Sequence, residues 1–348
     1  MGMIFHRLTG MVFAAMAACF LAGCLADADT SKPREEPFVG DGGDVPAKPV
    51  IPEGWPSALW PVDNPYTPAK AVLGRRLFFE TQHLSANGVV SCEWCHGPSA
   101  SFTDIHNHGF GKGIFSQPLL RTPPTLMNVL FASTFMFEGN VSTLEEQVLF
   151  PLYSSEEMAM TGPEIERRLR GDTLYVRLFR EAYGPGPIRM EGVAKALATY
   201  LRTLASTDTP YDRWKAGEED AIPLQAKAGE ALFMGKAQCF RCHTPPLFTD
   251  GKFHNTGLDS VPTDRGRALL TGLAKDEGRF KTPTLRNLTR SSPYMHDGRF
   301  LDLESVVEHY NAGGSPHAVN ADSLMVPLGL NGREAYDLAQ FLETLTDP

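Results

Sequence analysis

Residues 92–96 read Cys-Glu-Trp-Cys-His, and residues 239–243 read Cys-Phe-Arg-Cys-His. Both stretches follow the pattern C-x-x-C-H, which brings two thiols and an imidazole close together in the sequence. The thiols can form thioethers with the two vinyl groups on one haem edge, and the adjacent histidine can reach the iron as its proximal ligand. We therefore predict two covalently bound haem c groups. The attachment residues are Cys92, Cys95 and His96 for the first haem and Cys239, Cys242 and His243 for the second.

Two other kinds of site also use paired cysteines. Thioredoxin-like redox pairs and four-cysteine zinc sites both contain C-x-x-C. Neither requires a histidine directly after the second cysteine, and the two pairs lie outside the usual spacing of a zinc site. The sequence therefore favours haem over these alternatives.

The start of the chain has the features of an export signal. An uncharged apolar run at 11–21 is too short to span a bilayer, and it ends in Leu-Ala-Gly-Cys at 21–24, which looks like a lipoprotein signal-peptidase site. We predict a signal peptide at 1–23, lipidation of Cys24 and a flexible, Pro/Gly-rich tether at 24–60. Ordinary secretory cleavage near the same place is the alternative. The mature protein is then expected in the periplasm or cell envelope, held at the outer membrane by its lipid anchor alone.

Length and composition set the broad class of protein. The 348 residues are enough for two domains with their own cores, and 42% hydrophobic with 21% charged residues is a soluble, globular composition. The formal net charge of −9 argues against nucleic acid as a partner and is compatible with a basic redox protein.

The two halves of the chain repeat around the haem motifs. The repeated patterns are Gly-x-x-Leu-Phe at 74–78 and 229–233, Phe-Thr-Asp at 102–104 and 248–250, Pro-Thr-Leu-x-Asn at 124–128 and 283–287, and Leu-Glu at 144–145 and 303–304. The last two pairs share one offset of 159 residues. A constant offset predicts two copies of one haem-binding unit.

Hydrophobic periodicity indicates a helical protein. Apolar residues at helical spacing predict helices at 190–204 and 333–345, and the alternation typical of strands is absent. We predict an all-α fold of two cytochrome c-type haem domains related by an internal repeat, at 61–215 and 216–348. The domains are expected to join near 208–222, with both haems facing a shared interior.

These motifs, in this order, resemble the bacterial di-haem cytochrome c peroxidase family, including its MauG-like branch. The resemblance runs from about residue 61 to the C-terminus and includes Leu-Glu-Glu-Gln at 144–147, Phe-Lys-Thr-Pro-Thr-Leu-Arg-Asn at 280–287 and Pro-Tyr-Met-His-Asp-Gly at 293–298. It implies that peroxide reacts at the haem of the N-terminal domain. The haem of the C-terminal domain would pass electrons or store oxidising equivalents.

The resemblance also implies a sixth ligand for the second haem, fourteen residues after His296, where this chain has Tyr310. Peroxidases typically have methionine at that position, and MauG-like proteins have tyrosine. Tyrosinate is a hard anionic ligand that favours Fe(III) and Fe(IV) over Fe(II). The alternative is that Tyr310 packs under the haem while His309, His317 or Met325 ligates the iron.

The first haem is expected to be open on its distal side. The repeat offset leads from Tyr310 to Pro151, which cannot ligate iron. His106 and His108 lie in a Gly-rich loop after the first motif, together with Lys112 at the position where peroxidases use a loop histidine. Any of the three could close the site, or the two histidines could simply be exposed.

Peroxide cleavage needs an acid/base group to move a proton between the two oxygens. By resemblance, that group is Glu145, with Glu146 as the alternative, and a purely structural role for Glu145 is also open. Phe135 stands where we align the family's distal glutamine, and the tryptophan that bridges the haems has no clear counterpart. A calcium ion between the haems would use Thr122 and the carbonyls of Ser291 and Pro293.

The sequence therefore predicts an enzyme, a di-haem c-type peroxidase that reduces hydrogen peroxide with electrons from a small cytochrome c or a cupredoxin. One alternative is a MauG-like enzyme that oxidises side chains of a partner protein through high-valent iron. Another, from a different class, is a non-catalytic di-haem electron carrier in which both irons are six-coordinate.

Overall fold

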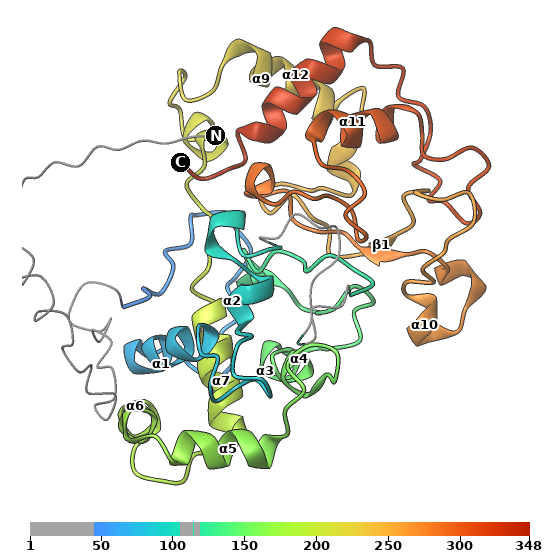
Figure 1. Cartoon of the computed structure of the whole chain (residues 1–348). Helices are drawn as coiled ribbons and strands as arrows, with labels where there is room; N and C mark the ends of the chain where they lie inside the picture. Colours follow the sequence, from blue (N-terminus) through green and yellow to red (C-terminus); the bar gives the residue numbers. More distant parts are fainter. Residues whose placement is uncertain (1–44, 105–113, 115–118) are drawn as a thin grey trace, which may run out of the picture. The chain divides into compact units, whose positions relative to one another are not determined.

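The computed structural model describes residues 45–104, 114 and 119–348, and residues 45–348 form one compact unit (Figure 1). The predicted signal peptide, the lipidation site Cys24 and the first part of the tether lie outside the described residues. So do the three loop residues His106, His108 and Lys112. Within the described ranges, no helix is long and apolar enough to cross a membrane.

Two pairs of long helices organise this unit. Helix α1 (Pro68–Phe78) packs against α7 (Met190–Leu201), and α9 (Leu224–Met234) packs against α12 (Gly332–Glu343). The helices predicted at 190–204 and 333–345 are thereby confirmed, with ends that differ by at most three residues. We call residues 45–207 the first half and 208–348 the second half, and each half contains one of these pairs.

A glycine permits the close contact within each helix pair. A Cβ atom on Gly74 would lie 1.9 Å from the carbonyl oxygen of Ala196, and one on Gly229 would lie 1.9 Å from that of Asp337. No side chain fits at such a distance, because the facing atoms belong to the backbone of the partner helix. This contact explains why the pattern Gly-x-x-Leu-Phe stands in both halves.

Aromatic residues fill the core behind each helix pair. In the first half the ring of Phe78 lies 5.3 Å from Tyr200 and 5.9 Å from Phe102. In the second half the ring of Phe233 lies 5.1 Å from Phe341 and 5.8 Å from Phe248. Burying each such ring contributes roughly 1.5–3 kcal/mol. The two cores thus use aromatic side chains at matching positions of the repeated patterns.

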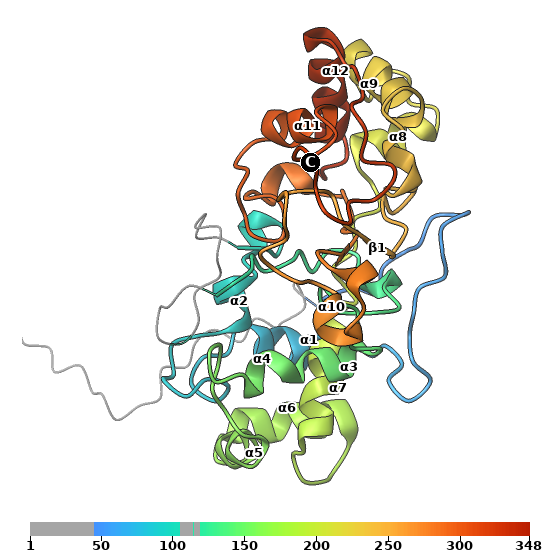
Figure 2. The same ribbon diagram turned by 90° about the vertical axis from the view of Figure 1, so that its right-hand side faces the viewer.

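The remaining elements are further helices, 3-10 turns and two strands. The first half has α2 (Cys92–Cys95), α3 (Leu144–Gln147), α4 (Leu149–Tyr153), α5 (Gly162–Arg170), α6 (Thr173–Tyr183) and the 3-10 turns η1 (Pro98–Ala100) and η2 (Val129–Phe131). The second half has α8 (Pro210–Lys215), α10 (Ala268–Thr271), α11 (Leu303–Asn311), η3 (Cys239–Arg241), η4 (Ala274–Asp276), η5 (Leu288–Arg290) and the strands β1 (Phe253–His254) and β2 (Phe280–Lys281). Figure 2 shows α5 and α6 at one end of the unit and α9, α11 and α12 at the other.

The fold is helical, as predicted. The one strand pair among the described residues is antiparallel, with Phe253 opposite Lys281 and His254 opposite Phe280. The predicted domain boundary after residue 215 stays a prediction, and Tyr211, which precedes it, already packs into the core of the second half.

Candidate functional site

The first C-x-x-C-H motif forms a single helical turn. Helix α2 (Cys92–Cys95) carries both cysteines, and the backbone N–H of His96 donates to the carbonyl of Cys92 at 2.9 Å. The ring Nδ1 of His96 lies 3.0 Å from the carbonyl oxygen of Phe102. Since a carbonyl only accepts, Nδ1 carries the proton and leaves Nε2 with a free lone pair. Burial lowers the pKa of His96, which keeps the imidazole in the neutral form that binds iron.

The second motif has the same geometry. The backbone N–H of His243 donates to the carbonyl of Cys239 at 2.8 Å, and its Nδ1 lies 3.0 Å from the carbonyl oxygen of Phe248. Burial lowers the pKa of His243 as well. Both accepting carbonyls belong to residues with left-handed backbones, at φ 57° for Phe102 and φ 53° for Phe248. The chain path therefore aims each imidazole.

The four cysteines are available for thioether bonds. None of the four forms a disulfide, and all four are half-buried. Burial raises the pKa of Cys92 and of Cys239 to about 12, whereas a reactive redox pair needs a lowered thiol pKa. Across the described part of the chain, no group of three or more His, Cys, Asp or Glu side chains could hold a metal ion. Thiols outside disulfides and imidazoles with an unprotonated Nε2 fit haem c better than zinc or a disulfide-exchange site.

Tyr310 lies near the second motif, as predicted. It is half-buried on α11 (Leu303–Asn311); burial and the nearby sulfurs of Cys239 and Cys242 raise the pKa of its phenol. The alternative ligand His309 already bonds through Nε2 to the carbonyl of Thr256 at 2.9 Å. This geometry favours Tyr310 over His309, and ligation by Tyr310 itself stays a prediction.

Glu145 is held in an ion pair. Its two carboxylate oxygens accept from Nη1 and Nη2 of Arg202 at 2.5 and 2.9 Å, and Asn64 Nδ2 donates to Oε1 at 2.7 Å. Burial alone would raise the pKa of Glu145, but the bonds and charge from Arg202 and the bond from Asn64 outweigh it and lower the pKa. A paired carboxylate is a weak proton carrier, so this geometry favours the structural alternative. The catalytic role of Glu145 is still a prediction.

Two further polar residues lie close by, and our sequence reasoning missed both. Glu157 is half-buried, burial raises its pKa, and its charge adds to the raised pKa of Cys92 in the first motif. The Oε1 atom of Gln147 is buried and has no hydrogen-bond partner. Glu157 was hard to recognise because Glu156 beside it is identical, and only the fold distinguishes the exposed residue from the half-buried one.

Of the residues predicted for calcium, Thr122 lies at the contact between the halves. Thr122 is buried, and its backbone N–H donates to the carbonyl of His296 at 2.8 Å, three residues after Pro293. Ser291 Oγ donates to the carbonyl of Leu288. Calcium binding at these three residues stays a prediction.

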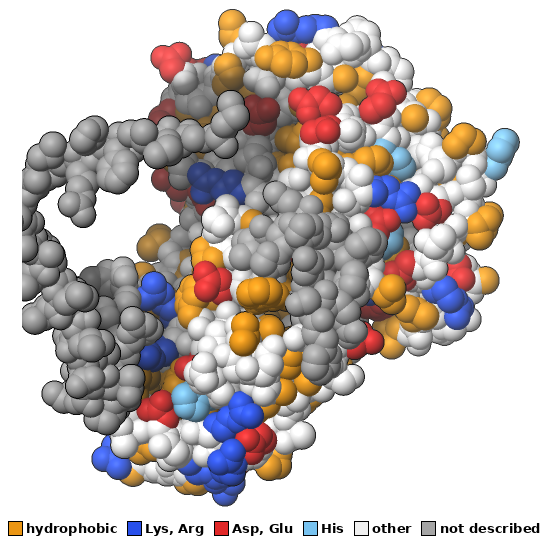
Figure 3. Space-filling view, viewed as in Figure 1, with side chains coloured by type: hydrophobic (Ala, Val, Ile, Leu, Met, Phe, Trp, Pro, Cys, Tyr) orange, Lys and Arg blue, Asp and Glu red, His pale blue; other side chains and the backbone are white. Residues whose placement is uncertain are grey.

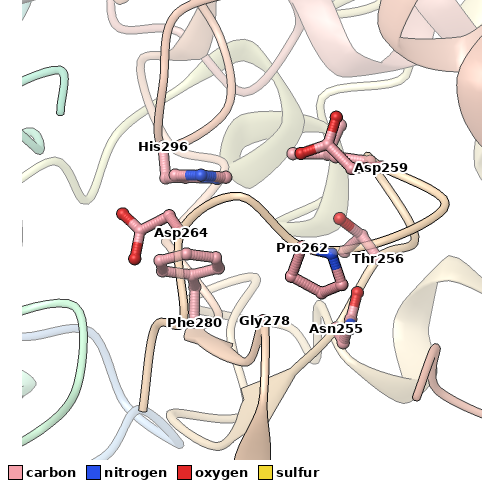
Figure 4. Close-up of a pocket in the computed structure, with 9 residues that line it drawn as sticks. Asn255, Thr256, Asp259, Pro262, Asp264, Gly278, Phe280 and His296 are labelled. Carbon is pink, nitrogen blue, oxygen red and sulfur yellow. The ribbon is translucent and has the colours of Figure 1, made fainter. Parts of the chain in front are cut away.

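A small pocket near this contact is shown in Figure 4. The ring of His296 stacks on Phe280 with centroids 3.9 Å apart and planes 16° apart. The two lining carboxylates are already paired, Asp264 with Arg121 and Asp259 with Arg299. None of the four cysteines lines the pocket, so it is not a haem site.

The surface carries no single large field of charge on the face drawn in Figure 3, where acidic and basic side chains are interspersed. This face therefore does not point to one docking area for a charged redox partner.

Comparisons with known proteins agree on one family. A family model described as di-haem cytochrome c peroxidase matches residues 68–220. The chain is 42% identical over 287 residues to the methylamine utilization protein MauG of Methylorubrum extorquens, covering 82% of this chain and 80% of that protein. It is 34% identical over 338 residues to the cytochrome-c peroxidase IdrP1 of Denitromonas iodatirespirans, covering 87% and 88%. The crystal structure of a MauG-like protein associated with microbial copper homeostasis matches with a TM-score of 0.79 and 32% identity, covering 85% of this chain and 95% of that one.

Proposed function

Because the chain belongs to the di-haem cytochrome c peroxidase family, which includes MauG, we propose that it reduces hydrogen peroxide with electrons from an external redox protein. The family predicted from the motifs is confirmed, and the chain is an oxidoreductase of the peroxidase kind. The observation that carries the proposal is the pair of C-x-x-C-H turns in which each histidine ring is held at 3.0 Å by a backbone carbonyl.

We propose two covalent haem c groups, one at each motif. The absence of a disulfide among the four described cysteines and the unprotonated Nε2 atoms of His96 and His243 support this assignment. When bound, the haems supply the iron that exchanges electrons with peroxide and with the donor. The matched glycine contacts, aromatic cores and histidine anchors of the two halves support our view that they are two copies of one cytochrome c unit.

We assign the acid/base role to Glu157 and compare it with Glu145. A half-buried carboxyl with a raised pKa can take a proton from peroxide and return it, whereas Glu145 is kept ionised by Arg202.

The test is peroxide turnover by the haem-loaded Glu157→Gln and Glu145→Gln variants. We expect turnover to fall by roughly 10²- to 10⁴-fold in Glu157→Gln, the usual contribution of a general acid/base, and by far less in Glu145→Gln. Glu156→Gln is the matched control, because this neighbour is exposed. Unchanged turnover in Glu157→Gln with a large loss in Glu145→Gln would return the role to Glu145.

A second candidate function is MauG-like oxidation of side chains in a partner protein. The observation that favours it is Tyr310 beside Cys239 and Cys242, since tyrosinate ligation stabilises oxidised iron. EPR of the ferric protein tests this ligation: we expect high-spin and low-spin signals, with the low-spin signal altered by Tyr310→Phe. Absence of any high-spin signal would instead favour the non-catalytic electron carrier.

For cellular location we propose export, lipidation of Cys24 and anchoring in the envelope, probed by fractionation of cells that express the Cys24→Ala variant. Loss of the variant from the membrane fraction is the expected result, on the strength of the Leu-Ala-Gly-Cys sequence at 21–24. A small cytochrome or cupredoxin would be the electron donor, or a protein the substrate.

A further inference from the structure

The two halves meet where strand β2 (Phe280–Lys281) of the second half lies against the first half. The backbone N–H of Lys281 donates to the carbonyl of Phe137 at 2.9 Å, and its Nζ donates to the carbonyl of Thr134. The ring of Phe280 lies 6.1 Å from the ring of Phe137. Lys281 therefore bonds the first half with both its backbone and its side chain.

Lys281 differs from Arg121 at this contact, although Arg267 likewise donates to a first-half carbonyl, that of Glu138. Arg121 pairs with both Glu138 and Asp264. Within the described ranges, no carboxylate forms an ion pair with Lys281, and its recorded side-chain neighbours are the carbonyl of Thr134 and the ring of Phe135, 5.8 Å from Nζ. Burial without a counter-charge lowers the pKa of Lys281 to about 8. Such an ammonium exerts a strong field on its surroundings.

The residues that follow β2 contact the second C-x-x-C-H motif. Thr282, the next residue, accepts from Thr249 Oγ1 at 2.7 Å through its carbonyl, and the carbonyl of Pro283 lies at the ring of His243. Lys281 thus precedes by two residues Pro283, whose carbonyl contacts the predicted proximal ligand His243. A nearby positive charge stabilises the reduced form of iron, which carries one positive charge fewer, and so raises the midpoint potential.

We propose that Lys281 is a positioning residue with two effects: its ammonium ties the second half to the first at Thr134, and its positive charge raises the midpoint potential of the haem held by His243. The inference rests on the proposed function, because it requires iron porphyrin at His243.

The experiment is a redox titration of the haem-loaded protein followed by absorption and EPR. Lys281→Gln keeps a donor for the Thr134 carbonyl and removes the charge, and Lys281→Arg keeps the charge. Lys252→Gln is the matched control, because Lys252 is an exposed lysine that immediately precedes β1 (Phe253–His254). We expect Lys281→Gln to lower the potential of the second haem, Lys281→Arg to retain it, and Lys252→Gln to leave it nearly unchanged.

Three outcomes decide the matter. A protein without haem absorption bands contradicts the proposed function and is seen before any titration. A haem-loaded Lys281→Gln with an unchanged potential overturns the inference. So does a Lys281→Arg variant whose potential falls as far as that of Lys281→Gln, because charge would then not be the cause.

If Lys281→Gln does not load haem, the wild type is titrated at pH 7 and at pH 9.5, since loss of the ammonium proton removes the same charge. Lys281→Arg, which stays charged at both values, corrects for other groups near the strand pair, namely His254 with Asp250 and Asp322, and Arg121 with its two carboxylates. The inference is overturned if the midpoint potential of the second haem changes equally between pH 7 and pH 9.5 in the wild type and in Lys281→Arg. A larger fall of this potential in the wild type than in Lys281→Arg supports the inference.

Discussion

The two C-x-x-C-H sites share the way their histidines are held, and they differ in the side chains around their cysteines. Tyr200 lies near Cys92 and His254 lies near Cys242, and each site has one further side chain to which we assign a role. At the first site this side chain is Glu157, a carboxyl with a raised pKa whose charge reaches Cys92. At the second site it is Tyr310, a phenol beside Cys239 and Cys242. A carboxyl can carry a proton and a phenolate can ligate iron. Under our proposal, Glu157 and Tyr310 give the two similar sites different roles.

The largest expected effect is the loss of one haem without the other when one cysteine pair is replaced. Alanine at both Cys92 and Cys95 should remove the first haem alone, and alanine at both Cys239 and Cys242 should remove the second alone, because each thiol pair binds its own porphyrin. The mass of the mature protein measures haem loss. Peroxide should still change the absorption spectrum only when the first pair is intact. Loss of both haems from one double variant would show that the sites do not mature independently.

A smaller effect tests whether the two scaffolds are equally tight. Gly74→Ala and Gly229→Ala should each lower the free energy of unfolding by about 3 kcal/mol, because the new Cβ would meet a backbone carbonyl at 1.9 Å and the helices must separate. Urea unfolding measures the loss. Gly186→Ala is the control, since nothing lies within 4 Å of its Cβ position. A tolerated alanine at either contact would contradict the close packing described for that half.

Glu145→Gln should destabilise the first half alone, by about 2–3 kcal/mol at neutral pH, because Arg202 is only 4% exposed and would keep a buried charge without its partner. Because folding lowers the pKa of Glu145, its contribution is fully present above about pH 4.5, its unfolded value, and is lost as the pH falls through the folded pKa. The difference between variant and wild type should therefore shrink in acid, as urea unfolding at pH 7 and pH 3 would show. Equal stability of Glu145→Gln and Glu146→Gln at pH 7 would contradict the ion pair.

The smallest expected effect is a gain in the free energy of unfolding, in the variant Glu157→Gln. Folding raises the pKa of Glu157, so the folded protein becomes less stable as the pH rises from about 4.5 through the folded pKa. Glu157→Gln removes this cost and should raise the free energy of unfolding at pH 7 by less than about 1 kcal/mol. Thermal unfolding against Glu156→Gln measures it. A clear loss of stability in Glu157→Gln would mean that its charge is compensated in the fold.

The parts of the molecule that local patterns encode could be predicted from the sequence. The helices at 190–201 and 332–343 show apolar periodicity, and the haem motifs are contiguous. Strands of two residues are too short to show alternation, so β1 and β2 left no signal.

The choice among acidic residues depends on distant contacts. Glu145 is paired by Arg202, 57 residues away, and nothing near it in the sequence indicates this. Glu156 and Glu157 differ only in how the fold exposes them. Lys281 was read as part of a family motif, and its bond to Thr134, 147 residues away, is likewise a product of the fold.

The anchors of His96 and His243 have a consequence for how this protein can change over time. Each ring is aimed by a main-chain oxygen, at Phe102 and at Phe248, and an exchange of side chain does not remove that oxygen. Both oxygens depend instead on a left-handed bend, which a β-branched residue adopts only at a cost and glycine adopts freely. Most substitutions at Phe102 and Phe248 should therefore leave the orientation of the two histidine rings unchanged. The substitutions that disturb it are those that alter the left-handed backbone.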